Sequence, residues 1–454
     1  MPSPETVDKV LAAIRRGDAA AYFFDRLTSP DWIRPLAERG LFRSPAAPIP
    51  VEEGRYIQFP IWAPSRYLSR VAHLDPEAVL EVTRDIPDVD NPRVYEDLVD
   101  AAVAMPPELA AQLVPRVRAW IRAPYQLLLP LKAGALLSHL ARGGQVEAAL
   151  VLARSLLAVQ QEERRLPEDG GIADLGFPPE ATPIFDVWDY ESILKEHIPD
   201  LVDAAGTDAL ILLRDVLAAA IRLSERVPEQ GNEDYSWIWR PAIEDHEKNH
   251  DRTAKDFLVS ALRDAALRLV ERGQVPLRDL AAIFEAGQKY VFDRLFLHLL
   301  TRFPEAAPDL LRDRLLDGDL FDLAQVSHEF GLLLNSGFRH LQEEDKRALL
   351  AKIETGPDLT RFRERFVEEQ GHEPSEDEVE QRQERWRHER LGLMGRDSLP
   401  EGWRGRFDEL VGRFGAAPDE DFPFFFRELG WRCLTEDCPR TDRYANSGSH
   451  RCSS

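Results

Sequence analysis

The sequence contains few cysteines. Only three occur among 454 residues, at Cys433, Cys438 and Cys452, close to the end of the chain. A disulfide-stabilised scaffold is therefore excluded for the preceding body. Structural zinc sites combine two closely spaced ligand pairs, a pattern that these cysteines and His450 do not form. We expect reduced thiols in a disordered tail over residues 431–454.

Long apolar runs are also missing. The most apolar stretch, residues 209–223, is interrupted by Arg214, Asp215 and Arg222, which is too polar for a helix that spans a bilayer. Residues 1–18 lack the apolar segment of a signal peptide. We therefore predict a cytoplasmic protein without a membrane partner.

Basic residues are scarce relative to acidic ones. The chain has 57 Lys and Arg against 80 Asp and Glu, a formal net charge of −23. Such an excess repels phosphate backbones unless the basic residues gather on one face. The Arg-rich run 382–390 is interleaved with Glu384 and Glu389, as is typical of a solvated helix with its own ion pairs. No nucleic-acid partner is expected.

The motifs of several enzyme classes do not occur. The sequence has no Gly-x-Ser-x-Gly, no phosphate loop ending in Gly-Lys-Ser/Thr, no Gly-x-Gly-x-x-Gly and no Cys-x-x-Cys. Serine hydrolases, nucleoside triphosphatases, dinucleotide enzymes and thioredoxin-like proteins each need one of these starting points. Most enzyme classes are therefore unsupported.

What the sequence does contain is a succession of amphipathic helices, the first group over residues 75–157. Asn91 and Pro92 are an N-cap and a first-turn proline, and apolar residues then recur at three- and four-residue steps. A break at 105–107 separates this helix from a second one with the apolar stripe Leu109, Leu113, Val114, Val117, Trp120 and Ile121.

A second group of helices is predicted over residues 253–354. Its apolar stripes include Phe257, Leu258, Ala261, Leu262 and Ala265, and then Val291, Leu295, Phe296, Leu299 and Leu300. Helix pairs recur every 30 to 40 residues, roughly the spacing of stacked helical hairpins, but no residue-level consensus recurs with them. We predict an all-α fold, a HEAT/armadillo-like α-solenoid of stacked helical hairpins.

Three irregular stretches divide the predicted body: residues 42–65, 162–185 and 228–252. Residues 42–65 contain five prolines and are expected to form an extended strap, with a short strand near residues 56–59. The predicted organisation is as follows: an N-terminal helical-repeat segment over 1–160, an acidic Gly/Pro-rich insertion or linker over 161–186, a C-terminal helical-repeat segment over 187–430 that includes a charged arm over 355–398, and the tail.

One metalloprotease-like motif is present. His246-Glu247-Lys248-Asn249-His250 matches His-Glu-x-x-His, in which two imidazoles on one helical face hold zinc and the glutamate serves as general base. In such enzymes the motif helix lies in the apolar core, whereas charged residues flank and fill this one. A polar loop is the favoured interpretation of the segment, and a metal-dependent hydrolase with His246 and His250 as zinc ligands is the alternative.

Two further groups of polar residues are candidates for a catalytic or metal-binding role. His250-Asp251 is the dipeptide of HD phosphohydrolases, for which His197 and Asp293 are the nominal remaining ligands. Asp186, Asp189 and Glu191 form an acidic cluster that could work as a carboxylate pair. Asp189 is, however, well placed to cap a helix that starts near Tyr190.

Several segments carry a family resemblance. They are residues 23–32 (Phe-Phe-Asp-Arg-Leu-Thr-Ser-Pro-Asp-Trp), 40–42, 59–68 (Phe-Pro-Ile-Trp-Ala-Pro-Ser-Arg-Tyr-Leu), 91–94 and 239–246. Together they resemble a family of large bacterial HEAT-like α-helical repeat proteins of uncharacterised activity. The resemblance implies a helical-repeat fold and a place in a multi-protein defence or signalling system, and it supplies no catalytic residues.

The sequence thus favours a non-catalytic scaffold for protein–protein interaction without a cofactor. Stacked hairpins form an extended surface, and such surfaces bind partners through aromatic anchors with a polar rim. The predicted anchors are tryptophans outside the helical stripes: Trp62, Trp188, Trp237 and Trp239.

Overall fold

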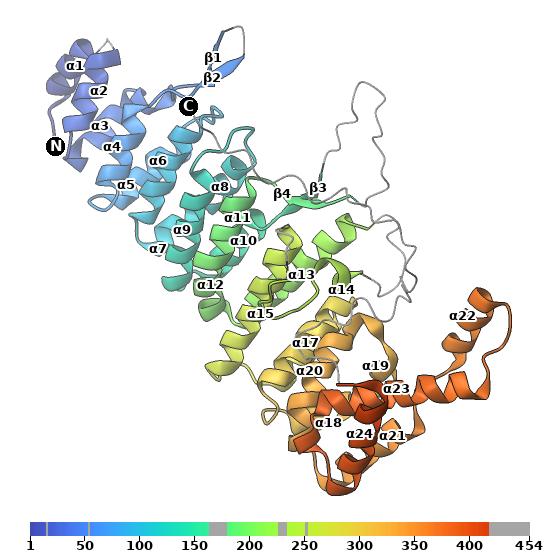
Figure 1. Cartoon of the computed structure of the whole chain (residues 1–454). Helices are drawn as coiled ribbons and strands as arrows, with labels where there is room; N and C mark the ends of the chain where they lie inside the picture. Colours follow the sequence, from blue (N-terminus) through green and yellow to red (C-terminus); the bar gives the residue numbers. More distant parts are fainter. Residues whose placement is uncertain (15–16, 53–54, 163–178, 226–233, 250–252, 417–454) are drawn as a thin grey trace, which may run out of the picture.

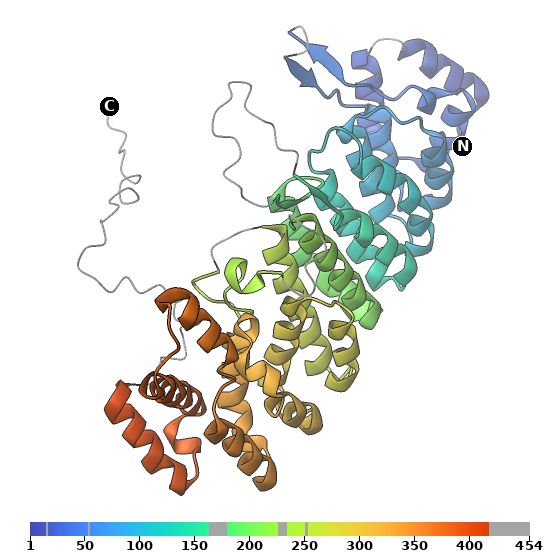
Figure 2. The same ribbon diagram turned by 90° about the vertical axis from the view of Figure 1, so that its right-hand side faces the viewer.

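The protein is all-α, with two short β-hairpins. The computed structural model describes residues 1–14, 17–52, 55–162, 179–225, 234–249 and 253–416. Figures 1 and 2 show that the helices follow one another along one long axis, from the N-terminal helices to the C-terminal ones.

Two rows of helices pack against each other and form the body of the array. In the first row each helix contacts the next, and its members are α4 (Ala63–Val71), α6 (Pro92–Val103), α9 (Leu129–Arg142), α12 (Ile198–Ala205), α15 (Ala254–Glu271), α17 (Tyr290–Arg302) and α20 (Ser327–Gly337). The second row comprises α5 (Pro76–Asp85), α7 (Pro107–Ala110), α8 (Val114–Ile121), α10 (Val146–Leu156), α13 (Thr207–Leu223), α16 (Leu277–Glu285) and α18 (Pro308–Leu315).

The remaining helices begin and end the array or join its members. They are α1 (Pro4–Ala13), α2 (Gly17–Arg26), η1 (Pro30–Trp32), α3 (Ile33–Glu38), η2 (Leu41–Arg43), η3 (Ala111–Leu113), α11 (Val187–Glu196), α14 (Ser236–Trp239), α19 (Gly318–Asp322), η4 (Ala324–Val326), η5 (Phe338–His340), α21 (Glu343–Thr355), α22 (Thr360–Gln370), α23 (Glu376–Met394), η6 (Arg396–Ser398) and α24 (Glu401–Phe414).

Helix boundaries follow local signals in the sequence. Asn91 caps α6 through a hydrogen bond from the Arg93 amide to its side-chain oxygen, with Pro92 in the first turn, as predicted. The single helix expected over 109–121 is instead broken into α7, η3 and α8. Pro115 lies in the first turn of α8, where the lack of an N–H group is tolerated, and this explains the new start.

The Pro-rich strap over 42–65 contains a β-hairpin and is tied to the helical body. β1 (Ile49–Val51) pairs antiparallel with β2 (Tyr56–Gln58), so the strand expected near 56–59 is present. The Asn91 amide group donates hydrogen bonds to the carbonyls of Ala46 and Pro60, at 2.8 and 2.9 Å. Figure 2 shows the hairpin projecting at the N-terminal end of the array.

The second hairpin flanks the predicted insertion. β3 (Val159–Gln161) pairs antiparallel with β4 (Ala181–Pro183), and both contact α13. This pairing brings together the two ends of the predicted insertion over 161–186. Residues 163–178 of that stretch lie outside the described residues, as do the predicted tail over 431–454 and all three cysteines.

The charged arm expected over 355–398 has two different parts. No described side chain of helix α22 is buried, and Figure 1 shows this helix projecting from the array. The second half of α23 instead packs against α20 and α24 and buries Trp386, Leu391, Leu393 and Met394. Arg390 is also buried there and donates a hydrogen bond to the Phe321 carbonyl. Because polar residues are spread along the whole segment 355–398, the sequence pattern did not predict this apolar contact.

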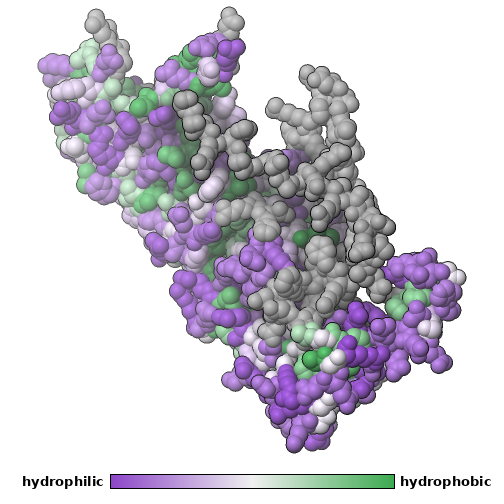
Figure 3. Space-filling model, in the orientation of Figure 1, coloured by the Kyte–Doolittle hydropathy of each residue, from purple (hydrophilic) through white to green (hydrophobic). Residues whose placement is uncertain are grey.

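The buried apolar residues form one continuous core along the array. In the view of Figure 3, hydrophilic residues cover the outer edge of the N-terminal helices and the projecting C-terminal ones. Across the described ranges, every helix is either too short or too polar to cross a membrane.

Candidate functional site

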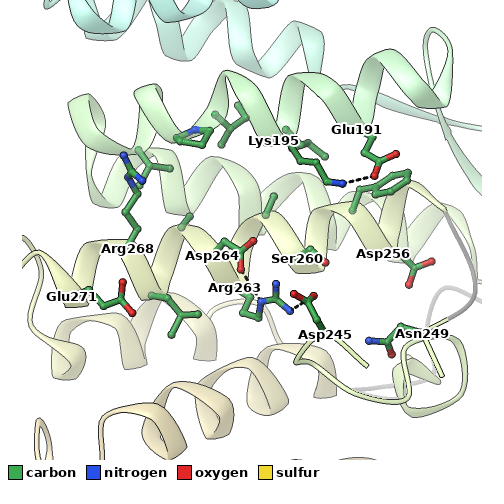
Figure 4. A pocket seen from close by; sticks show the side chains of 18 of the residues that line it. Glu191, Lys195, Asp245, Asn249, Asp256, Ser260, Arg263, Asp264, Arg268 and Glu271 are labelled. Atoms are coloured by element: carbon green, nitrogen blue, oxygen red, sulfur yellow. Dashed lines mark hydrogen bonds and ion pairs between the residues drawn. The ribbon is translucent and has the colours of Figure 1, made fainter. Parts of the chain in front are cut away.

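A groove of about 870 Å³ lies between helices α11 and α12 on one side and α15 on the other. The loop over residues 240–249 forms a further part of its wall (Figure 4). Its lining combines apolar residues such as Leu194, Ile198 and Phe257 with charged ones. The labelled charged and polar residues in Figure 4 are Glu191, Lys195, Asp245, Asn249, Asp256, Ser260, Arg263, Asp264, Arg268 and Glu271.

The α11 side of the groove is set by a capped helix. Asp186, not Asp189, is the N-cap, because its carboxylate accepts the amide hydrogen of Trp188 at 2.8 Å. Capping therefore starts the helix three residues earlier than the sequence suggests. Glu191 and Lys195 follow one turn apart and form an ion pair at 2.6 Å along the groove.

The α15 side carries several ion pairs. A capping box between Thr253 and Asp256 starts this helix. Arg268 and Arg272 both form ion pairs with Asp203 of α12, with shortest distances of 2.6 and 2.5 Å. These charges are therefore partnered before any ligand binds, and the two walls are held together.

Buried arginines hold the loop over 240–249. Arg240 donates from Nε to the Ala242 carbonyl at 2.9 Å, and Arg263 donates from Nη1 to the Ile243 carbonyl at 2.9 Å. Arg294 of α17 donates to the Pro241 carbonyl at 3.0 Å. Without these bonds, the backbone carbonyls of the loop would be buried without hydrogen-bond donors. Because the arginines donate to them, the loop is held in one position as a wall of the groove.

A cluster of buried charged side chains lies behind this loop. Glu329 of α20 binds Arg294 through two hydrogen bonds of 2.8 Å, and its Oε1 accepts the Ile243 amide hydrogen at 3.1 Å. Nε2 of His328 lies 2.7 Å from Oε1 of Glu244. Ligand-type atoms of Glu244, His328 and Glu329 all lie within 4.8 Å of one another.

The pKa values in this cluster reflect burial and pairing. Burial alone would raise the pKa of Glu244, but the hydrogen bond and the charge of His328 outweigh it and lower that pKa to about 2. For His328, burial favours the neutral form, yet the bond to Glu244 raises its pKa overall. Burial lowers the pKa of the nearby His298 on α17.

The His-Glu-x-x-His motif does not form a helix in its described part. Residues 244–249 form bends and a turn, and His250 lies outside the described residues. Nδ1 of His246 accepts the Lys248 amide hydrogen at 3.1 Å, so one ring nitrogen is used to stabilise the turn. The helical face that a zinc protease needs is absent from residues 246–249, and the polar-loop interpretation fits this geometry.

Of the HD-type grouping, only His197 and Asp293 belong to the part of the chain that the structure describes. Nδ1 of His197 lies 2.9 Å from the Ser138 hydroxyl of α9. Asp293 lies on α17, where Arg314, Asp234 and Glu285 are the charges that act on it. His250 and Asp251 fall outside the described residues.

The four predicted tryptophan anchors differ in exposure. Trp62 is only 8% exposed and packs edge-on against Phe42, so its ring is part of the buried apolar core. Trp188 is 69% exposed and precedes Glu191 on α11 by three residues, which places it on the same helix face as the groove lining.

The other two tryptophans belong to α14 and are half-buried. Nε1 of Trp239 donates to the Asp234 carbonyl at 2.9 Å, and the Lys255 ammonium lies 5.0 Å from the centre of its ring. Trp237 is its neighbour on the same short helix. Trp188 is therefore the predicted anchor that is best exposed to a partner.

Sequence reasoning missed most residues of the groove and of the charge cluster. Arg263, Arg294 and His298 occupy buried positions on helices whose buried side chains are mostly apolar. A charged residue inside an apolar stripe was the available signal, because such a group is rarely buried without a partner. The partners, however, are far away in the sequence.

Comparisons with protein-family models, with curated proteins and with solved structures find no match to this chain.

Proposed function

We propose that this chain is a non-catalytic, HEAT-like helical-repeat scaffold that binds an extended segment of a partner protein in the groove along α15. The observation that carries the proposal is the groove itself, which combines fixed walls, an apolar lining and an exposed tryptophan on the adjoining helix face. The two rows of helices support the assignment as a solenoid.

The dimensions of the groove suit a short peptide segment. Lining residues on α15 run from Asp256 to Arg272, which corresponds to about 24 Å along a helix. An extended chain advances by about 3.3 Å per residue, so about seven residues fit. Phe257 and Ala261 are half-buried in the lining and leave apolar surface for a side chain of the partner.

The charges of the groove favour a partner segment of mixed polarity. Lys195 is paired with Glu191, Arg263 with Asp245 and Asp264, and Arg268 with Asp203. A groove whose charges are already paired does not select strongly for one sign of charge. Affinity then comes from the apolar lining and from Trp188, with the ion pairs as a polar rim.

Peptide selection against the purified chain tests this proposal. Peptides of 7 to 12 residues selected from a random library are labelled, and their affinity is measured by fluorescence anisotropy. We expect Trp188→Ala and Ala261→Glu each to weaken binding by at least about tenfold, because a hot-spot residue contributes about 2 kcal/mol or more.

Tyr22→Ala is the matched control, because Tyr22 is equally exposed but lies on α2, far along the chain from the groove. It should leave affinity unchanged. Peptides whose binding survives both groove variants, or falls equally with Tyr22→Ala, would contradict the proposed site. The same variants can then be used in co-purification from the source cells. A protein that co-purifies with the unaltered chain but not with the two groove variants is the natural partner.

A further inference from the structure

We propose that Glu244, His328 and Glu329 form a binding site for a divalent transition-metal ion of the zinc type, with His298 as the fourth ligand. This site is separate from the His-Glu-x-x-His motif and from the groove lining. It joins the loop over 240–249 to helices α17 and α20.

The donor set fits such an ion. Zinc takes imidazole nitrogens and carboxylate oxygens at about 2.0–2.2 Å, usually in tetrahedral geometry, which places ligand atoms about 3.4 Å apart. The candidate atoms of Glu244, His328 and Glu329 lie within 4.8 Å of one another, so small side-chain shifts suffice. The hydrogen bond of 2.7 Å between His328 and Glu244 would lengthen as the ion enters.

His298 is not one of the three residues whose ligand atoms lie within 4.8 Å of one another, so it becomes the fourth ligand only after its ring shifts towards them. Two buried polar atoms favour this shift. Among the described residues, Nδ1 of His298 and Oε2 of Glu244 are buried and have no hydrogen-bond partner. The His298 residue is only 7% exposed. His298 follows Arg294 by one helical turn, which places it on the face of α17 that Arg294 presents to Glu329. Glu244 and Glu329 are both among the charges that act on it.

The charge balance is compatible with a bound cation. Glu244 and Glu329 carry two negative charges, and Arg294 supplies one positive charge through its ion pair with Glu329. Buried charges are costly unless they are compensated, and without an ion the protonated ring of His328 is the positive partner of Glu244. A metal ion replaces this proton, because a histidine ligand binds through a neutral ring nitrogen.

Glu329 can bind an ion without releasing Arg294. A carboxylate offers about four lone-pair positions. Two are used by Arg294 and one by the Ile243 amide, which leaves one position. An ion also has a route from solvent, because the Glu244 side chain is 30% exposed.

Cobalt titration of the full chain, first stripped with a chelator, tests the site. We expect one Co²⁺ per chain, with visible absorption bands that report nitrogen and oxygen ligands, and displacement of these bands by Zn²⁺. His328→Gln keeps a group that can hydrogen-bond to Glu244 but removes the imidazole, and His298→Gln does the same at the fourth position. Each should weaken binding by at least about tenfold.

The double variant His246→Gln/His250→Gln is the matched control, because it removes both histidines of the sequence motif and neither proposed ligand. It should bind Co²⁺ as the unaltered chain does. Absence of the absorption bands in the unaltered chain would overturn the proposal, and so would their loss in the control variant. If His328→Gln fails to fold, which far-ultraviolet circular dichroism shows, the unaltered chain and the control still decide the outcome.

Discussion

Arg294 and Glu329 form a doubly hydrogen-bonded ion pair in the protein interior, where each side chain is only 1% exposed. The pair joins α17 to α20, and both residues also bind the loop over 240–249. Arg294 donates to the Pro241 carbonyl, and Glu329 accepts from the Ile243 amide. One ion pair thus fixes two neighbouring helices and the loop that forms part of the groove wall.

Removal of one member of this pair should be strongly destabilising. We expect Glu329→Ala to lower the free energy of unfolding by about 3–5 kcal/mol, because it leaves the Arg294 charge buried without its carboxylate. Urea denaturation followed by circular dichroism measures the change. The double variant Arg294→Met/Glu329→Leu should lose less stability than the sum of the losses in the single variants Arg294→Met and Glu329→Leu. Additive losses would show that the two side chains act independently.

The strap should depend on the side-chain amide of Asn91. This residue both caps α6 and donates to the Ala46 and Pro60 carbonyls. Asn91→Asp keeps the capping oxygen but removes the donors. We therefore expect faster hydrogen exchange of the amides over residues 47–59 while α6 keeps its protection.

Ser375→Ala is the control for loss of a cap alone, because Ser375 caps α23 far from the strap. It should cost about 1 kcal/mol without changing exchange in the strap. Unchanged strap exchange in Asn91→Asp would mean that the hairpin is held by other contacts.

Two of the predicted anchor tryptophans should respond differently to truncation. Trp62→Ala removes a buried ring that packs on Phe42, and we expect a loss of about 3–5 kcal/mol of stability. Trp188→Ala removes an exposed ring and should change stability by less than about 0.5 kcal/mol. Thermal and urea unfolding of the two variants check this. A large loss for Trp188→Ala would mean that its ring stabilises the fold rather than serving a partner.

Asp293 should make stability depend on pH. Burial raises its pKa from 3.8 to about 6 in the folded protein, although Arg314 partly opposes the shift. The folded state therefore holds the proton more tightly than the unfolded state, so the contribution of Asp293 to stability is fully present below pH 3.8 and is lost as the pH rises through about 6. The full shift corresponds to about 3 kcal/mol, an upper bound because the side chain is only partly buried.

Asp293→Asn removes this titration. Relative to the unaltered chain, the variant should be more stable at pH 7.5, and its advantage should shrink at pH 4.5. Urea denaturation at both pH values measures the difference. An advantage that does not depend on pH would show that the pKa of Asp293 is not raised in the folded state.

The helical content and many helix boundaries could be predicted because their causes are local. An N-cap such as Asn91 acts within three residues, and apolar side chains repeat at the helical period. The failures also have local reasons. Asp186 capped α11 ahead of Asp189, and Pro115 started a new helix inside an apolar stripe.

The sequence alone determined that this chain forms successive amphipathic helices with an apolar side to bury. Only the tertiary structure decided which polar residues meet, because their contacts cross from one helix to another. Glu244 and His328 are 84 positions apart, and Arg268 and Asp203 are 65 apart. No local period or cap relates such residues. Their meeting follows from the order in which helices stack along the rows, and that order created both the groove and the buried charge cluster.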